Sequence, residues 1–463
     1  MLIHADDGAV LEFILDPYKH QRRELKEHWA DEARAFPWQM RSAKSAVAVV
    51  SSAELWQRGR LDGVIVVSPA RIHHAWARDE YPKHCTVPFV AHSWNCTRDQ
   101  TPEQKGSLER LRAGVKRGEL GALCINKEAL LKERVWKVVR AFAKAYRCML
   151  IVDESHHWGG AGKKGSKRIR ALAQYCLYRR ILSGTMVGNS PGRVYAQYQI
   201  LQEGALGYKN AAEFVAAHGT FVFDGRHWVQ DKKVWKDMEL LRERMAKWGR
   251  PVLRSDCPDL PPVVSSRQYH ELSNLARIEY EQAVEDSKEF DPPNHNMVRK
   301  AAMAGKIDDL RDILPGLLED GPAIVWVPFT ETVDGLTAIL QHGGFLAAAH
   351  HGKLSARARE QAIRAAFGHG GVLVSTPEAL QEGADLSGAR SIVWYAPPWD
   401  VITFDQARER CTAMRGEPTI EVQMCAKDTI EEGVYRCLER KEDVADWVIG
   451  QGMVEYMEGK GMW

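Results

Sequence analysis

Two adjacent carboxylates, Asp153 and Glu154, stand directly after an apolar run that covers residues 148–152. Such a run is typical of a buried parallel strand, and residues just past its carboxyl end lie at the edge of the sheet where ligands bind. There, one carboxylate can hold Mg²⁺, usually through water, and the next can orient or deprotonate an attacking water. The same letters also fit an ordinary strand that ends in an acidic turn, so the pair alone leaves both interpretations open.

A lysine and a serine, Lys44 and Ser45, precede a second apolar run. A phosphate-binding loop needs backbone N–H groups, a lysine for the β- and γ-phosphates, and a hydroxyl for Mg²⁺ at the start of a helix. Lys44 and Ser45 have these identities, but Arg41, Ser42 and Ala43 stand where the glycines of such a loop are expected. Ala43 is the smallest available substitute, and the close backbone approach that glycine permits is therefore open to question.

Two further features could contact a ligand. Gln21 lies in the first turns of a helix predicted after Pro17, and its amide could meet a base-like ring as both donor and acceptor. The basic stretch 162–170, which includes Lys167, could touch a nucleic-acid backbone beside a phosphate site, although such stretches are usually just solvated.

The overall composition narrows the class of protein. A chain of 463 residues exceeds one ordinary core, so about two or three domains are expected. Because 63 Lys and Arg nearly balance 61 Asp and Glu, any nucleic-acid site must be a local basic surface. The nine cysteines form no CxxC pair, which indicates neither a zinc cluster nor a disulfide framework. No signal-peptide pattern and no long apolar span is visible, so we expect a cytoplasmic protein with no membrane partner.

Predicted strands alternate with predicted helices in both halves of the chain. The strands are expected at 63–67, 122–125, 148–152, 180–182, 323–327, 346–350, 371–376, 391–395 and 419–425. This alternation is typical of parallel sheets with right-handed crossovers. We therefore expect an α/β fold with two tandem domains, at 1–206 and 266–463, that are joined by a helical insertion and linker at 207–265 and enclose a cleft.

At this point the order of the motifs resembles that of the superfamily-two helicases and translocases, in particular the Swi/Snf-like group with its compact phage and bacterial members. The resemblance runs from Pro17 to about Lys441. In the first half it rests on HQ at 20–21, MRSAKS at 40–45, SPARIHHAWARDE at 68–80 with its Trp and Glu, CINKEALL at 124–131, the DEAH-type DESH at 153–156 and SGT at 183–185. In the second half it rests on VPFTETVDGL at 327–336, the segment 350–367, STPEALQEGADLSGA at 375–389, QARER at 406–410 and DTIEEGVYRCLERK at 428–441.

This resemblance implies two RecA-like domains that bind ATP and Mg²⁺. Lys44 and Ser45 are then expected on the phosphates and Mg²⁺, Asp153 on Mg²⁺, Glu154 on the attacking water and Gln21 on adenine. The remaining nucleotide contacts are expected from Arg41, Ser42, Ala43, Gly383 and Asp385, with Arg410 and Arg415 as catalytic arginines. Coupling to nucleic acid, or contact with it, is expected from His156, Ser183, Gly184, Thr185, Ser68, Asn126, Lys167, His351, Gly352, Ser375 and Thr376.

Two departures from the family pattern bear on activity. One is the glycine-poor phosphate loop, and the other is Ala413, which stands where a second arginine belongs, with Arg415 two positions late. The leading hypothesis is an ATP-driven translocase or helicase on DNA, duplex or forked, with single-stranded DNA or RNA left open. The alternatives are a nucleotide-gated DNA-binding module that has lost efficient hydrolysis, and the motor subunit of a larger restriction, defence or repair assembly. We expect a monomer in the cytoplasm of a bacterium or of a phage-infected host.

Overall fold

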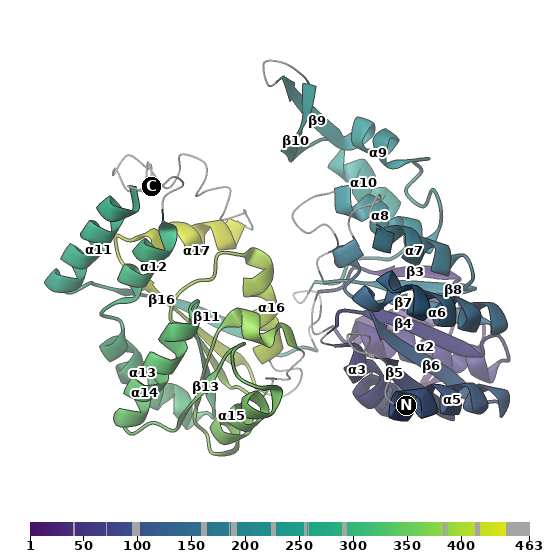
Figure 1. Cartoon of the computed structure of the whole chain (residues 1–463), viewed down its shortest axis with the longest axis horizontal. Coiled ribbons are helices and arrows are strands. Elements are labelled where there is room, and N and C mark those ends of the chain that lie inside the picture. Colours follow the sequence, from purple (N-terminus) through teal and green to yellow (C-terminus); the bar gives the residue numbers. More distant parts are fainter. Residues whose placement is uncertain are drawn as a thin grey trace. The chain divides into compact units, whose positions relative to one another are not determined.

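A computed structural model of the chain consists of two compact units, residues 1–259 and 260–463 (Figure 1). The structure describes residues 1–39, 42–70, 72–94, 102–158, 164–184, 186, 192–223, 228–253, 257, 259–288, 294–382, 386, 388–412 and 417–440.

Unit 1 is built on a parallel sheet of six strands in the order β3-β8-β7-β4-β6-β5. The strands are β3 (Ala33–Phe36), β4 (Gly63–Ser68), β5 (Phe89–Trp94), β6 (Leu120–Asn126), β7 (Cys148–Val152) and β8 (Tyr178–Leu182). Every residue of β4, β6 and β7 is buried, which explains why these strands are continuous apolar runs. A separate two-stranded sheet near the N-terminus pairs β1 (Leu2–His4) with β2 (Val10–Glu12).

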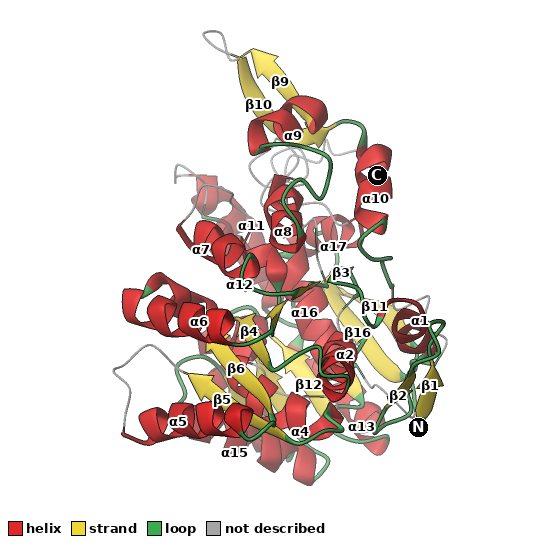
Figure 2. Cartoon of the chain, turned by 90° about the vertical axis from the view of Figure 1, so that its right-hand side faces the viewer, coloured by secondary structure: helices red, strands yellow, loops and turns green. Residues whose placement is uncertain are grey.

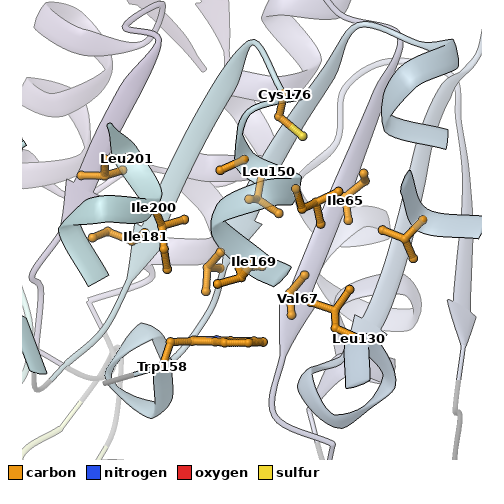
Figure 3. Close-up of a cluster of buried hydrophobic side chains, with 14 of the residues drawn as sticks. Ile65, Val67, Leu130, Leu150, Trp158, Ile169, Cys176, Ile181, Ile200 and Leu201 are labelled. Carbon is orange, nitrogen blue, oxygen red and sulfur yellow. The ribbon is translucent and has the colours of Figure 1, made fainter. Parts of the chain in front are cut away.

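Helices and helical turns connect the strands of unit 1. They are α1 (Lys19–His28), α2 (Lys44–Gln57), α3 (His73–Ala75), η1 (Trp76–Glu80), α4 (Tyr81–His84), α5 (Pro102–Lys116), η2 (Lys127–Leu131), α6 (Glu133–Ala145), η3 (Ser155–Trp158), α7 (Lys164–Ala173) and α8 (Gly192–Leu201). Figure 3 shows the core on one face of this sheet, where Ile65 and Leu150 from the strands meet Ile169 and Ile200 from the helices. This packing fixes the carboxyl ends of the central strands, which carry the candidate site.

The segment that follows α8 contains a β-hairpin where only helices and a connector were expected. The hairpin pairs β9 (Gly219–Phe223) with β10 (Trp228–Trp235), lies between α9 (Ala211–His218) and α10 (Met238–Ala246), and extends beyond α9 (Figure 2). Both strands are rich in aromatic and β-branched residues, which favour an extended backbone, and the charges of β10 mask that signal in the sequence. Residues 207–259, which include this hairpin, belong to unit 1.

Unit 2 repeats the architecture with a parallel sheet of six strands in the order β11-β16-β15-β12-β14-β13. The strands are β11 (Val263–His270), β12 (Ala323–Trp326), β13 (Ala347–His350), β14 (Val372–Ser375), β15 (Ser391–Trp394) and β16 (Thr419–Ala426). Its helices are α11 (Asn274–Lys288), α12 (His295–Met303), α13 (Ile307–Glu319), α14 (Thr330–His342), α15 (Ala356–Gly368), η5 (Pro377–Glu382), α16 (Val401–Cys411) and α17 (Ile430–Arg440).

Alternate residues of the central strands of unit 2 enter two separate cores. Ile324 and Trp326 of β12 join one cluster, whereas Ala323 and Val325 join the other. Since successive side chains of a strand point to opposite faces, helices must cover both faces of this sheet. The expected α/β fold with two tandem RecA-like parallel-sheet domains is thus confirmed.

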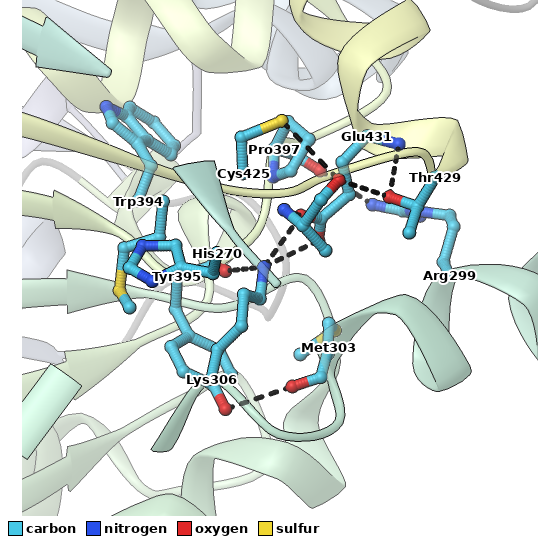
Figure 4. A network of polar contacts seen from close by, with 12 residues as sticks. His270, Arg299, Met303, Lys306, Trp394, Tyr395, Pro397, Cys425, Thr429 and Glu431 are labelled. Carbon is cyan, nitrogen blue, oxygen red and sulfur yellow. Dashed lines mark hydrogen bonds and ion pairs between the residues drawn. The ribbon is translucent and has the colours of Figure 1, made fainter. Parts of the chain in front are cut away.

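A buried ion pair joins the helices of unit 2 to the ends of its strands (Figure 4). Lys306 Nζ lies 2.7 Å from both carboxylate oxygens of Glu431 and donates a further hydrogen bond to the carbonyl of Tyr395. The Ala426 N–H, at the end of β16, donates to the same carboxylate at 2.8 Å. Both charged side chains are almost completely buried, so each is neutralised inside the protein rather than by water.

Candidate nucleotide site

The predicted residues of unit 1 gather at the carboxyl edge of its sheet. Ser68 and Asn126 are paired in register at the ends of β4 and β6. Asp153 follows β7 directly, and its N–H donates to the Val67 carbonyl at 2.9 Å. Ser183 follows β8 in the same way. Strands that are far apart in the sequence therefore bring these polar side chains to one edge.

Asp153 is held by two neutral donors. The Trp76 indole N–H donates to Oδ2 at 2.9 Å, and the backbone N–H of Glu154 donates to Oδ1 at 2.9 Å. Burial, together with the charge of Glu154, raises the pKa of Asp153 well above its usual range, although Trp76 and Lys44 act in the opposite direction. This carboxylate thus lies where a bound cation would be stabilised.

Glu154 differs from its neighbour in conformation and in charge. Its φ of 46° lies in the left-handed region, which costs a non-glycine residue about 1 kcal/mol or more. Burial acts to raise the pKa of Glu154, but the hydrogen bond from His156 and the charge of Lys44 prevail and lower it. His156 Nδ1 lies 3.2 Å from Glu154 Oε2 and 2.9 Å from Ser183 Oγ. The imidazole of His156 therefore links the ionised Glu154 to Ser183, the residue that follows β8.

Lys44 is the first residue of α2, and Ala43 before it has φ 53° and ψ 49°. This is the left-handed conformation that glycine adopts without strain, so the alanine takes up the backbone shape for which a glycine was expected. The Lys44 ammonium donates to the carbonyls of Trp38 at 3.0 Å and Gln39 at 3.3 Å. Because its charge lowers the pKa of both Asp153 and Glu154, Lys44 and the acid pair belong to one site.

Gln21 and the histidine before it hold the backbone of this loop. Gln21 Nε2 donates to the Ala43 carbonyl at 2.9 Å, and His20 Nε2 donates to the Ser42 carbonyl at 2.8 Å. The Gln21 oxygen accepts the Tyr18 N–H at 2.8 Å. Contact of Gln21 with adenine stays a prediction, and its role in shaping the loop is a contact that the sequence could not reveal.

The structure adds two residues to which the sequence gave no role. Trp76 and Glu80 are the first and last residues of η1, a short π-helical turn. Trp76 donates to Asp153 at 2.9 Å. Burial raises the pKa of Glu80, and an interaction with Ser45 opposes this shift. The spacing of these two residues within WARDE was the only available signal, and it does not reveal their partners.

The predicted nucleic-acid contacts of unit 1 have different surroundings. Ser68 and Asn126 are about 1% exposed, and each has a buried oxygen without a hydrogen-bond partner among the described residues. Gly184 follows Ser183 at the same edge. Lys167 lines a cavity of about 240 Å³ beside Arg179, which lies at the beginning of β8, the end away from Ser183. The structure therefore does not bring Lys167 to the acid pair.

The predicted residues of unit 2 lie at the ends of β13 and β14 and on α16. His351 is buried and its Nε2 lies 3.1 Å from Asp334 Oδ1, whereas Gly352 beside it is exposed. Ser375 and Thr376 are buried, and Ser375 Oγ lies 2.9 Å from His350 Nδ1. Arg410 is half-buried in the last turn of α16. Five predicted site residues lie outside the described part of the chain: Arg41, Thr185, Gly383, Asp385 and Arg415.

The donor set at Asp153 and Ser45 fits magnesium. Mg²⁺ keeps several waters and is usually held by one or two carboxylates together with substrate phosphates. Within the described ranges, no three His, Cys, Asp or Glu side chains converge as a metal cluster of their own. Asp153 supplies a buried carboxylate directly after a strand, and Ser45 supplies a hydroxyl in the first turn of α2, and both are ligand types that such a shared site uses.

Across the described helices, none is both long and apolar enough to cross a membrane.

Residues 305–414 match the family of the helicase conserved C-terminal domain. This helicase-domain segment extends from before α13 through α16 and includes four of the six strands of unit 2. None of the curated proteins matches the chain. Among solved structures, the chain is similar to the SWI2/SNF2 ATPase core of Sulfolobus solfataricus in complex with dsDNA, at 14% identity over 97% of this chain and 96% of that chain, with a TM-score of 0.43. At that score the likeness carries no argument about this chain.

Proposed function

We propose that the chain is an ATP-dependent helicase or translocase that acts on nucleic acid, and on DNA in particular. One observation carries the proposal: Lys44 at the start of α2 shares a site with Asp153 and Glu154 at the end of β7. The match of residues 305–414 to a helicase domain favours a helicase or translocase over other classes of ATP-binding protein. The motif order from Pro17 to Lys441 supports the same function.

The phosphates of ATP bind at the beginning of α2. The N–H groups of a first helical turn have no partner within the helix, so they attract anions. When the phosphates bind, the Lys44 ammonium leaves the carbonyls of Trp38 and Gln39 and donates to phosphate oxygens instead. Ser45 and Asp153 hold Mg²⁺, which when bound neutralises charge on the phosphates.

Glu154 positions the attacking water. Its lowered pKa keeps it ionised at neutral pH, which a group that accepts a proton from water requires. The 2.9 Å contact between His156 and Ser183 links this acid to the next strand end, and we assign it the coupling of nucleotide state to nucleic acid. Arg410, together with Arg415 beyond the described residues, is proposed to stabilise charge on the phosphate.

The nucleic-acid side of the proposal rests on the resemblance of the motifs. Duplex or forked DNA is the proposed track, and contacts to phosphates rather than bases make binding tolerant of sequence and sensitive to salt. The proposed setting is a monomer in the cytoplasm.

Replacing the phosphate-loop lysine tests the assignment. Lys44→Ala is expected to lower steady-state ATP hydrolysis by at least about 100-fold, because a preorganised charge on the phosphates is lost, while binding of DNA stays measurable. The exposed Lys116 at the end of α5 offers a matched control, Lys116→Ala, with hydrolysis expected within about twofold of the parent. Measuring ATPase stimulation by single-stranded, duplex and forked DNA and by RNA identifies the track. Equal hydrolysis by Lys44→Ala and the parent would rule out the assignment.

A second candidate is a DNA-binding module that is gated by nucleotide and lacks efficient hydrolysis. The attachment of Lys44 to two carbonyls favours it, because phosphate binding must first replace both contacts. Such a module shows DNA affinity that changes with ATP but no turnover with or without DNA. Turnover above about 1 s⁻¹ in the presence of DNA, which is the lower end of ordinary enzyme rates, excludes it.

A further inference from the structure

One π-helical turn contacts the carboxylate that we assign to magnesium. The turn η1 spans five residues, Trp76–Glu80, between α3 and α4. Its first residue donates to Asp153 at 2.9 Å. π-helical turns are rare and are frequent at functional sites, so this contact calls for a functional explanation.

The contact of Trp76 fixes the orientation of the Asp153 carboxylate. Trp76 is 2% exposed, and an indole N–H is a donor only, so the bond can run in one direction alone. With the Glu154 N–H on the other oxygen, each oxygen of Asp153 has one protein donor at 2.9 Å. Each carboxylate oxygen has about two acceptor sites, and one site per oxygen therefore remains in a defined direction.

We propose that Trp76 is a positioning residue for magnesium, because it orients the Asp153 carboxylate. The inference rests on the proposed function, since it takes the magnesium and the nucleotide from it. Partners of this kind typically contribute about 10- to 100-fold to metal affinity.

Trp76→Phe tests the contact of Trp76 with Asp153, since it removes the indole N–H and keeps an aromatic ring. The experiment measures binding of a non-hydrolysable ATP analogue to the whole chain by titration calorimetry, at increasing Mg²⁺ and in EDTA. We expect the Mg²⁺ concentration for half-maximal effect to rise about tenfold, with the affinity in EDTA unchanged. Trp136→Phe is the matched control, because Trp136 is buried in the same unit with its ring beside Arg140 and Arg168.

The outcomes separate this inference from the proposed function. A parent protein with no Mg²⁺-dependent nucleotide binding contradicts the proposed function, and the inference falls with it. A parent with such binding, whose Trp76→Phe variant keeps its Mg²⁺ requirement, leaves the function standing and overturns the positioning role. A variant that loses affinity equally in EDTA also overturns it, because it points to general damage.

Discussion

Unit 1 and unit 2 each bury carboxylates at the carboxyl end of a sheet, but only unit 2 places a cation directly on one. Glu431 has the Lys306 ammonium at 2.7 Å from both oxygens and the Ala426 N–H at 2.8 Å. Asp153 has two neutral N–H donors and a second carboxylate, Glu154, as its neighbour in the chain.

Lys44 of unit 1 is used differently from Lys306 of unit 2. Lys44 donates to two carbonyls, and its charge lowers the pKa of both acids of the pair. A buried carboxylate with its own cation is complete and holds elements together. Two adjacent buried carboxylates repel each other, and a bound cation relieves this repulsion. The comparison therefore assigns stability to the ion pair of Lys306 and Glu431, and chemistry to the acid pair of Asp153 and Glu154.

The largest expected effect comes from breaking the ion pair of unit 2. Lys306→Met leaves Glu431 buried without its cation and is expected to destabilise the protein by about 3–5 kcal/mol. Adding Glu431→Gln to this variant should recover most of the loss, because a buried pair replaced by uncharged residues is often close to neutral. Urea denaturation measures both variants. Equal destabilisation of the single and the double variant would contradict the pairing.

Acidification is expected to weaken unit 1 before unit 2. Burial lowers the pKa of His73, His84 and His92 to about 4. Since the folded pKa lies below the unfolded value, the neutral histidines contribute stability that is complete above pH 6.5 and is lost as the pH falls toward 4. Between pH 8 and pH 6 the loss is roughly 0.8 kcal/mol for each histidine, which is about 2.4 kcal/mol for the three together. In unit 2, burial also lowers the pKa of His270, but Asp309 opposes the shift from 2.9 Å.

Amide hydrogen exchange on the whole chain distinguishes the two units. After correction for the intrinsic pH dependence of exchange, peptides from the core strands of unit 1 should lose protection between pH 8 and pH 6, and those from unit 2 should keep it. An equal loss in both units would remove this part of the comparison.

The fold could be predicted from the sequence wherever a strand is a continuous apolar run. β4, β7 and β12 are such runs, and their expected positions agree with the structure within a few residues. β3 was missed because it carries Arg34, which is buried only because it pairs with Glu24 at 2.8 and 2.9 Å. Hydrophobic pattern cannot reveal a charge that a distant partner neutralises.

The candidate site likewise has residues that the sequence could predict and contacts that it could not. Asp153, Glu154 and Lys44 could be predicted as site residues from their residue types, from the apolar runs beside them and from the order of the motifs. The contact of Trp76 with Asp153 spans 77 positions, and that of Gln21 with Ala43 spans 22. These residues come into contact only when the sheet forms, so no local sequence pattern reveals their contacts. Likewise, the missing glycine raised a doubt that only the left-handed φ of Ala43 could answer.

Asp153→Asn gives the smallest expected effect on stability, and the effect has the opposite sign to that of Lys306→Met. It removes the charge that burial and Glu154 disfavour, while the amide oxygen can still accept from Trp76, so we expect the folded state to gain about 1 kcal/mol as ATP hydrolysis is lost. Thermal melting in EDTA without nucleotide measures the gain. Glu360→Gln, at an exposed ion pair with Arg364 on α15, is the control and should stay within about 0.5 kcal/mol of the parent. A loss of stability in Asp153→Asn would show that the acid pair is as complete as the ion pair of unit 2, and the contrast between the two units would no longer hold.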